Sequence, residues 1–355
     1  MTVLDRINTY NYFIKAQLVL GFLFFYTTCE QQNKMSLLTG ETMGTTYSIK
    51  IVQNTDLIDI ESIKIGVDSV LIHINKQMST WDPNSEISAF NQWSSIKAYP
   101  VSKPLLTVID SAISISIKTD GFFDISIYDL MSLWGFGPNP RIGMPSLNEI
   151  KTVLASTGYD KIRVSNNTLA KTHPKVKLDL NAIAKGYGVD IVFQYIKEQG
   201  YDNIFVEIGG EVRSSGKNQY NEFWSIGIEN PSGGDKKDIQ LAAIVDLDQR
   251  AVATSGNYRN IVNIDGEVLG HTINPRTGFP IQTNVLSVTV FAQSSMIADG
   301  WATALMVMDY QTGLDNINND KGLEAIWVME EKDGTRKIGH SPGVIMRQAI
   351  YDLKD

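Results

Sequence analysis

The sequence predicts an α+β fold in which mixed or antiparallel sheets are flanked by helices. Apolar residues recur at helical spacing in the first half of the chain, whereas short strands follow one another at hairpin distance from residue 161 onward. These strand pairs outnumber alternating strand–helix units, which argues against a doubly wound sheet. No Pro/Gly/Ser-rich linker interrupts residues 40–355, so any domains within residues 41–355 are expected to be interleaved.

Four elements are expected in the first half. Residues 44–52 alternate apolar and polar side chains, which is typical of a strand. Residues 60–78 carry apolar side chains at helical spacing and predict an amphipathic helix. A second helix is expected over 104–118, beginning at Pro104 and ending before Gly121. The sequence "SLNE" at 146–149 is a capping box and predicts the start of a third helix.

The second half is expected to consist mostly of strands. Hairpins are predicted around Asn166–Asn167, Asp265–Gly266 and Asp333–Gly334, since these dipeptides favour tight turns. The other predicted strands are "VKLDL", "NIFVEIGG", "FWSIGIEN", "AAIVDL" and "VLSVTVFA". The last of them leads into a predicted helix, "SSMIADGWATALMVM", which Ser294 or Ser295 can cap.

Composition excludes several classes of function. The net charge is −8 and no lysine/arginine block is present, which argues against a nucleic-acid partner because phosphate neutralisation needs a basic surface. A single cysteine, Cys29, allows neither an internal disulfide nor a multi-cysteine metal cluster. No two of the four histidines are spaced i,i+4, which excludes a helical HExxH zinc site.

The first 29 residues are typical of a secretory signal that ends at a lipoprotein-type cysteine. Arg6 and Lys15 precede the apolar run "AQLVLGFLFFY", which is about half the ~20 residues that a membrane-spanning helix needs. Tyr26 and Thr28 depart from the residues usual before an acylated cysteine. An uncleaved anchor and a buried N-terminal strand are the alternatives. Residues 30–40 would then form a tether.

The segment "KLDLNAIAKGYGVD" at 177–190 combines an acid, a base and two glycines where a predicted strand becomes a helix. Asp179 ends the strand, Asn181 is a plausible N-cap, and Lys185 lies in the second helical turn. A helix N-terminus with a nearby lysine suits a phosphate group. Gly186 and Gly188 each cost about 1 kcal/mol in a helix relative to alanine, which close approach by a ligand or another backbone would explain. The alternative is a surface Asp–Lys pair with glycines packed on a sheet.

Asp299 and Thr303 are spaced i,i+4 and therefore share one face of the last predicted helix. Their neighbours on that helix are apolar, so a buried acid and hydroxyl need partners. A hard cation such as Mg²⁺ would satisfy both through oxygen ligands. The alternative is an exposed Asp299 with Thr303 bonded to helix carbonyls.

Three further features suggest a ligand site. The loop "HTINPRTGFP" at 271–280 gathers more polar groups than a turn needs. The stretch "EIGGEVRSSG" is no G-x-G-x-x-G fingerprint, so Gly209–Gly210 are predicted to form a tight bend rather than part of a dinucleotide fold. Met43 and Trp81, which lie beside small polar residues, could sandwich a flat ring; core packing is the alternative for either.

These motifs, in this order, resemble the ApbE family of FAD:protein FMN transferases. The matching stretches are "ETMGTTYSI", "MSTWDPNSEISAFN", "GFFDIS", "LDLNAIAKGYGVD", "EIGGEVRSSG", "VATSGNYRN", "HTINPRTG" and "SMIADGWATALMVM". They extend from about residue 41 to 308 and so cover most of the chain. The family is often a lipoprotein, which agrees with lipidation at Cys29.

The resemblance implies two sets of site residues. The positions that match flavin-nucleotide contacts are Met43, Trp81, Phe122, Phe123, Asp124, Asp179, Lys185 and Ile273. The positions that match Mg²⁺ ligands are Ala182 through its backbone carbonyl, Asp299, Ala302 through its main chain, and Thr303. The candidate general bases are Asp179, His271 and Asp299.

The implied function is Mg²⁺-dependent transfer of FMN from FAD to a Ser or Thr hydroxyl of an acceptor protein, with release of AMP. Acceptors in the family are typically subunits of membrane redox pumps that face the periplasm. The resemblance therefore implies an inner-membrane lipoprotein on the periplasmic side. Two alternatives stay open: an FAD pyrophosphatase, in which water replaces the acceptor, and a periplasmic FAD-binding lipoprotein without catalysis.

Overall fold

The structure is a computed structural model that describes residues 33–53, 59–231, 240–257, 261–264 and 266–349. The predicted signal segment 1–29, with Cys29, lies outside the described residues. Within the described part of the chain, no helix combines the length and apolarity needed to cross a membrane.

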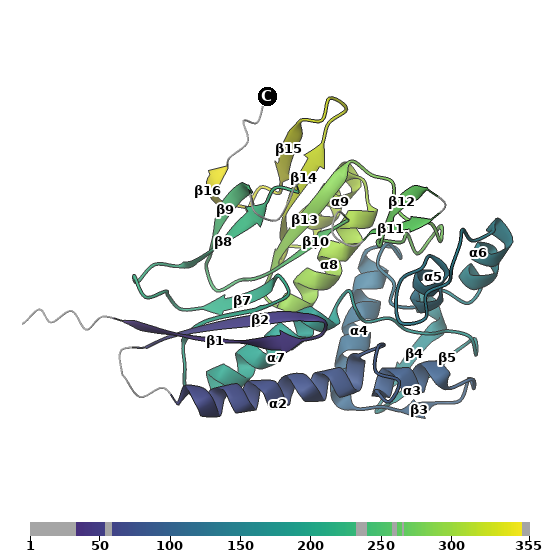
Figure 1. The fold of residues 1–355 in the computed structure, drawn as a ribbon, viewed down its shortest axis with the longest axis horizontal. Helices are drawn as coiled ribbons and strands as arrows, with labels where there is room; N and C mark the ends of the chain where they lie inside the picture. Colours follow the sequence, from purple (N-terminus) through teal and green to yellow (C-terminus); the bar gives the residue numbers. More distant parts are fainter. Residues whose placement is uncertain (1–32, 54–58, 232–239, 258–260, 265, 350–355) are drawn as a thin grey trace, which may run out of the picture.

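An eight-stranded antiparallel sheet forms the centre of the molecule (Figure 1). Its strand order is β1-β2-β6-β7-β10-β13-β14-β15, and every neighbouring pair is antiparallel. The strands are β1 (Lys34–Thr42), β2 (Thr45–Gln53), β6 (Asn203–Ile208), β7 (Glu211–Ser215), β10 (Ala251–Gly256), β13 (Val285–Ala292), β14 (Glu324–Glu330) and β15 (Arg336–His340). The predicted α+β class is confirmed.

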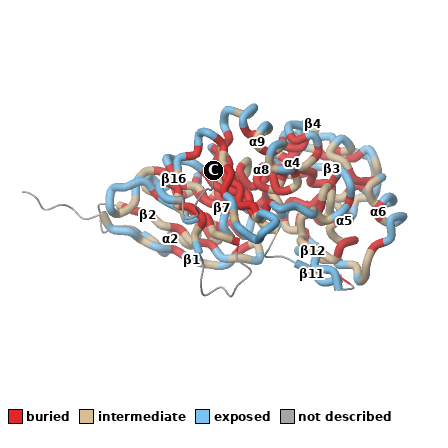
Figure 2. Tube along the Cα trace, turned by 90° about the horizontal axis from the view of Figure 1, so that it is seen from above, coloured by how far each residue is buried: buried red, intermediate tan, exposed pale blue. Residues whose placement is uncertain are grey.

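Both faces of this sheet are covered because side chains alternate along each strand. On β14, Ala325 and Trp327 face one core, which contains helices α4 and α8, while Ile326 and Val328 face the other. The second core is closed by a smaller sheet of β8 (Trp224–Glu229), β9 (Leu241–Leu247) and β16 (Met346–Ala349). Figure 2 shows the buried residues gathered along the middle of the molecule around β7, α8 and α4.

The helices lie mainly on the face of the sheet opposite β8 and β9 (Figure 1). They are α2 (Ile60–Met78), α3 (Glu86–Gln92), α4 (Lys103–Lys118), α5 (Tyr128–Leu133), α6 (Leu147–Leu154), α7 (Ala184–Glu198), α8 (Ser295–Val307) and α9 (Tyr310–Asn319), with a 3-10 turn at Tyr159–Lys161. Helix α2 buries Ile63, Val67 and Leu71 against the first strands. The predicted bounds of α2 and α4 are confirmed to within a residue.

Local signals located most of the smaller elements correctly. Ser146 and Glu149 form the predicted capping box of α6. The hairpin about Asn166–Asn167 joins β4 (Ile162–Ser165) to β5 (Thr168–Lys171), which also pairs with β3 (Tyr99–Pro100). The two remaining predicted hairpins are β11 (Ile261–Ile264) with β12 (Glu267–Gly270), and β14 with β15.

The domain begins earlier than the sequence suggests. Residues 34–40, expected to be part of a tether, belong to strand β1, which pairs with β2 from Lys34↔Gln53 to Thr42↔Thr45. The continuous ladder satisfies the backbone of this segment, which a solvated tether would leave to water. At most four residues therefore separate Cys29 from the first strand.

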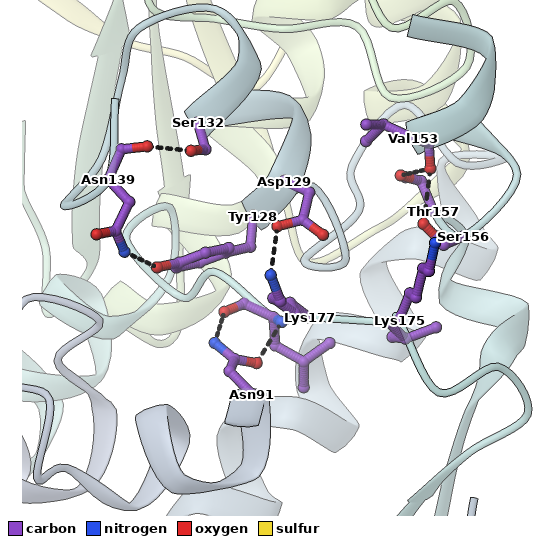
Figure 3. Close-up of polar contacts among 12 residues, drawn as sticks. Asn91, Tyr128, Asp129, Ser132, Asn139, Val153, Ser156, Thr157, Lys175 and Lys177 are labelled. Carbon is purple, nitrogen blue, oxygen red and sulfur yellow. Dashed lines mark hydrogen bonds and ion pairs between the residues drawn. The ribbon is translucent and has the colours of Figure 1, made fainter. Parts of the chain in front are cut away.

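The predicted strand "VKLDL" at 176–180 forms no strand and joins no sheet. Val176, Leu178 and Leu180 are buried, as alternation predicted. The side chain of Asn91, on α3, replaces the neighbouring strand: its Nδ2 donates to the Leu178 carbonyl at 2.8 Å and its Oδ1 accepts from the Leu178 N–H at 2.7 Å (Figure 3). Nearby, Lys177 Nζ contacts Asp129 Oδ1 at 2.9 Å.

Helix α7 follows this segment and crosses α8 at Gly186. A Cβ atom at Gly186 would overlap the backbone carbonyl of Ser295, so the two backbones meet without an intervening side chain. Gly188 differs, because a Cβ atom there would approach only side chains: the Cε of Met43 at 3.1 Å, and Met43 Sδ and Ile208 Cδ1 at 3.6 Å. Close approach of another backbone therefore explains the first glycine.

We expect Gly186→Ala to destabilise the protein by about 2–3 kcal/mol, since the added methyl group must push α7 from α8. Gly188→Ala is the matched control: the flexible Met43 side chain can move, and the gain in helix propensity of about 1 kcal/mol offsets the contact. Urea unfolding would measure both free energies. Equal effects of the two substitutions would contradict the role assigned to the α7–α8 crossing.

Candidate functional site

A cavity of about 820 Å³ opens where the sheet, α7, α8 and three loops meet, a volume within the usual range for small-molecule sites. It brings together almost every motif singled out in the sequence. The lining includes Met43–Thr46, Phe122–Ile125, Ile127, Met131, Asp179, Asn181, Ala182, Lys185, Glu207, Gly209–Glu211, Gly227–Glu229, Thr254–Gly256, His271–Ile273, Pro275, Ser287, Asp299, Thr303 and Val307.

Two carboxylates fix α7 and α8 to each other by capping one another's helix. Asp299, on α8, accepts a hydrogen bond from the Gly186 N–H in the first turn of α7 at 3.0 Å. Asp190, on α7, accepts from the Ser295 and Met296 N–H groups at the start of α8, at 3.0 and 2.9 Å. Each acid thus satisfies donors that the other helix leaves free. Asn181 is not the N-cap of α7, contrary to the prediction.

Asp299 and Thr303 point into the cavity from one face of α8, as their spacing predicted. Asp299 is buried, at 3% exposure, so the exposed-edge alternative is wrong. Its Oδ2 binds Gly186, whereas Oδ1 receives no hydrogen bond from any described residue. The Thr303 hydroxyl contacts the Ser255 hydroxyl, on β10, at 3.2 Å.

The side-chain oxygens of Asp299 and Thr303 are too few to fill the coordination shell of a hard cation, so a bound ligand would have to supply further oxygens. No three His, Cys, Asp or Glu side chains among the described residues form a preassembled metal cage. A carboxylate oxygen that lacks a hydrogen bond and a hydroxyl one turn further along are nevertheless oxygen donors of the kind Mg²⁺ prefers, and Mg²⁺ usually keeps waters and substrate phosphates as its other ligands. The residues therefore fit Mg²⁺ bound jointly with a phosphate compound.

Lys185 reaches into the cavity from the first turn of α7 and pairs with Glu211, an acid that sequence reasoning missed. Lys185 Nζ lies 2.5 Å from Glu211 Oε1. Burial lowers the pKa of Lys185, but the carboxylates of Asp299 and Glu211 raise it by more, so the ammonium stays charged. Lys185 is the single lysine among the described lining residues, whereas six lining residues are carboxylates: Asp124, Asp179, Glu207, Glu211, Glu229 and Asp299.

Burial raises the pKa of several of these carboxyls above its ordinary value. Desolvation raises the pKa of Asp299, which the nearby Lys185 partly opposes. It also raises the pKa of Asp179, although the Asn181 backbone and side chain both donate to that carboxylate. The pKa of Glu211 rises to about 7 through burial, against the attraction of Lys185. A raised pKa makes a carboxylate a better proton acceptor near neutral pH.

The segment around Asp124 forms one wall of the cavity. Asp124 accepts hydrogen bonds from the N–H groups of Ser126 and Tyr159, each at 2.7 Å. Both carboxylate oxygens are therefore occupied in holding this loop. Phe122, on the same wall, is covered by the Arg276 guanidinium, whose carbon lies 4.6 Å from the ring centroid.

The loop 271–280 also lines the cavity and is the tight turn that the sequence predicted. Asn274 Oδ1 accepts from Arg276 N at 2.9 Å, and Gly278 adopts φ 77°, which favours glycine. The turn places His271 and Ile273 on the lining. The His271 ring also lies edge-to-face against Phe136, with centroids 6.4 Å apart.

Two tight turns bring backbone close to the cavity. Met43 has φ 50° in the β1–β2 turn, and its side chain packs beside Gly188. Gly209 and Gly210, with φ 63° and 108°, form the predicted bend between β6 and β7. A Cβ atom at Gly209 would lie 2.8 Å from Thr45 Cγ2, so the two turns touch.

Two predicted site residues lie outside this cavity lining. Trp81 is 62% exposed in the loop after α2, and its contact with a flavin stays a prediction. Ala302 is fully buried within α8, and its main-chain role toward a metal likewise stays a prediction. Sequence reasoning missed Glu211, Ser255 and Asp190. All three stand in the stretches quoted above, and their acidic or hydroxyl side chains were the available signal.

The chain is similar to known flavin transferases over most of its length. The family model described as "ApbE family" matches residues 43–327. The chain is 39% identical to the FAD:protein FMN transferase of Vibrio cholerae over 323 residues, which cover 91% of this chain and 96% of that protein. It is 31% identical to the Escherichia coli K12 protein of the same name over 334 residues, covering 90% and 93%.

Two solved flavin transferase structures have a similar fold. The flavin transferase ApbE from Vibrio cholerae superposes with a TM-score of 0.79 at 38% identity, covering 87% of this chain and 98% of that one. The apo form of the Pseudomonas stutzeri flavinyl transferase ApbE has a TM-score of 0.79 at 34% identity, covering 88% and 96%.

The raised pKa of Glu211 makes the stability of the ligand-free protein depend on pH. The ordinary pKa of 4.5 applies to the unfolded chain, so between pH 4.5 and about 7 the unfolded state loses a proton that the folded state keeps. The stabilising contribution is complete below pH 4.5 and is lost as the pH rises through 7. We expect the free energy of unfolding to fall from pH 5 to pH 8 by a few kcal/mol, with Asp179 and Asp299 acting in the same direction.

Urea unfolding at several pH values would measure this slope, and Glu211→Gln should make it shallower. Asp68→Asn is the control, since Asp68 lies on α2 away from the cavity and the pKa of its carboxyl is lowered through Lys64 and Tyr47. A Glu211→Gln protein with the wild-type slope would refute the assignment.

Proposed function

The chain belongs to the ApbE family, and we propose that it transfers FMN from FAD to a Ser or Thr hydroxyl of an acceptor protein and releases AMP. The observation that carries this proposal is the convergence of the flavin-matching residues other than Trp81 with Asp299 and Thr303 on one cavity. We further propose that the acceptors are flavoprotein subunits of membrane redox complexes, which match the acceptors typical of the family.

We propose Mg²⁺ as the cofactor, held by Asp299 and Thr303 with main-chain carbonyls of Ala182 and Ala302. When bound, Mg²⁺ would neutralise pyrophosphate charge and stabilise charge that develops on the leaving AMP. Ala182 lines the cavity beside Asn181, which supports a contribution from its carbonyl. The burial of Asp299 and the oxygen that lacks a hydrogen bond support this assignment.

The protein's own residues would position and neutralise the reacting groups. Lys185 places a positive charge in a cavity whose other fixed charges are mostly negative. The acceptor hydroxyl oxygen forms a bond to the FMN-side phosphorus as the bond from that phosphorus to the AMP oxygen breaks. Asp179, Asp299 and His271, all on the lining, are the candidate groups that receive the hydroxyl proton. Phosphoryl transfer depends chiefly on such positioning and charge compensation.

A membrane tether through Cys29 would place the site near such acceptors, on the periplasmic side of the inner membrane. Strand β1 begins at Lys34, so the connection from Cys29 spans five residue steps, or about 18 Å when fully extended. The domain would then lie directly against the membrane surface.

The first test concerns Asp299. We expect Asp299→Ala to reduce FMN transfer by about 10²–10³, because a lost electrostatic contact at a transition state costs about 3–4 kcal/mol. Transfer to an acceptor would be followed by in-gel flavin fluorescence across a Mg²⁺ titration, beside a melting curve.

A separate assay of the wild-type protein distinguishes the alternative functions. AMP release from FAD and Mg²⁺ without acceptor would identify a pyrophosphatase. FAD binding without AMP release, with or without acceptor, would identify a binding protein.

Lys185→Ala serves as the comparison, since it should weaken FAD binding while transfer stays metal-dependent. Near-normal transfer by Asp299→Ala at low Mg²⁺ would refute the metal assignment. A loss of melting temperature without a selective loss of transfer would make Asp299 a structural residue.

The second test concerns Cys29. We expect metabolic labelling with a fatty acid to mark the wild-type protein and to miss Cys29→Ser. A soluble fragment that begins just before strand β1 should keep transfer activity, because the described cavity residues all lie beyond that strand. Equal labelling of both proteins, or of neither, would end the lipoprotein proposal.

A further inference from the structure

Glu211 is a buried acid that the proposed chemistry does not use. It is the first residue of β7, directly after the Gly209–Gly210 bend, and is 3% exposed. Its Oε1 pairs with Lys185, whereas its Oε2 is buried and has no hydrogen-bond partner among the described residues. A buried carboxylate that is only half satisfied destabilises the fold, and an apolar residue would serve packing better. The contact with Lys185 is therefore the feature of Glu211 that can explain why an acid occupies this position.

Two carboxylates, those of Asp299 and Glu211, attract the ammonium group of Lys185. One oxygen of Asp299 accepts no hydrogen bond from any described residue and could therefore accept one from Lys185. The ammonium nevertheless lies on Glu211, on the β7 side of the cavity. If Glu211 were absent, Asp299 would be the remaining carboxylate that attracts Lys185. That new pair would withdraw the ammonium from the cavity and occupy the oxygen that a cation needs.

We infer that Glu211 is a positioning residue that holds Lys185 on the β7 side of the cavity and away from Asp299. Lys185 then contacts a phosphate group of the flavin nucleotide as a separate cation, and the free oxygen of Asp299 stays available to a metal ion. This inference rests on the proposed function, because it assumes that the cavity binds FAD.

The test uses FAD binding, measured by flavin fluorescence in the presence of EDTA so that no metal contributes. Simple charge removal predicts tighter binding by Glu211→Gln, because one negative charge beside the pyrophosphate is lost. Positioning predicts the opposite: the dissociation constant should rise about tenfold or more for Glu211→Ala. Glu211→Gln should show a smaller rise, because its carbonyl can still accept from the ammonium. In transfer assays, KM for FAD should rise more than kcat falls.

A second background isolates the route through Lys185. In Lys185→Met, adding Glu211→Gln should no longer weaken FAD binding, because the group that Glu211 positions is gone. Equal weakening with and without Lys185 would overturn the inference, as would tighter binding by Glu211→Gln in the wild-type background.

The matched control is Asp68→Asn, which removes another carboxylate from a lysine pair, here with Lys64 at 2.6 Å on α2 and outside the cavity lining. Its FAD affinity should equal that of the wild type. Melting curves identify any variant that fails to fold, and Glu211→Gln, which removes a buried charge, keeps the test open if Glu211→Ala unfolds. A wild type that binds FAD yet transfers no FMN would refute the proposed function while leaving this binding test valid.

Discussion

The reciprocal capping of α7 and α8 is the constraint on which the rest of the site depends. Asp299 closes the start of α7 and Asp190 closes the start of α8, across a crossing that Gly186 leaves open to direct backbone contact. Asp299 is also a cavity residue. The hydrogen bond that it accepts from Gly186 therefore both joins the two helices and fixes a side chain of the site. Arg213, which pairs with Asp190 at 2.7 Å, extends this arrangement to strand β7, the strand that carries Glu211.

The charge of the cavity determines what it can bind. Among the described residues, six carboxylates and one lysine line it, so accompanying cations would reduce the repulsion that an anionic ligand such as a pyrophosphate meets there. Lys185 supplies one positive charge, and a hard cation bound by Asp299 and Thr303 would supply more. This balance explains why the site combines buried acids, whose pKa values burial raises, with a lysine held by a carboxylate. An acid-rich cavity also predicts that a bound metal ion strengthens anion binding.

Strong local signals predicted most of the secondary structure. The capping box at Ser146, the hairpin at Asn166–Asn167 and the apolar spacing of α2 each act within a few residues of the chain. Secondary-structure predictions failed where the hydrogen-bond partners of a segment lie far away in the sequence. The composition of residues 34–40 predicts a tether, because their pairing with β2 is not visible in their own sequence. Alternation over 176–180 predicts a sheet strand because it indicates burial but not the partner, and the Leu178 backbone pairs with the side chain of Asn91 instead.

The sequence by itself determined the family, the class of fold and most residues of the cavity, since the motifs that carry the chemistry are continuous and keep their order along the chain. It also placed Asp299 and Thr303 on one helix face, because that relation depends only on helical geometry. Only the tertiary structure decided that Asp299 caps α7, that Glu211 holds Lys185, and that Trp81 lies outside the cavity lining. Each of these depends on contacts or positions set by elements distant in sequence, whose spacing in the folded protein comes from packing across the sheet and at the α7–α8 crossing.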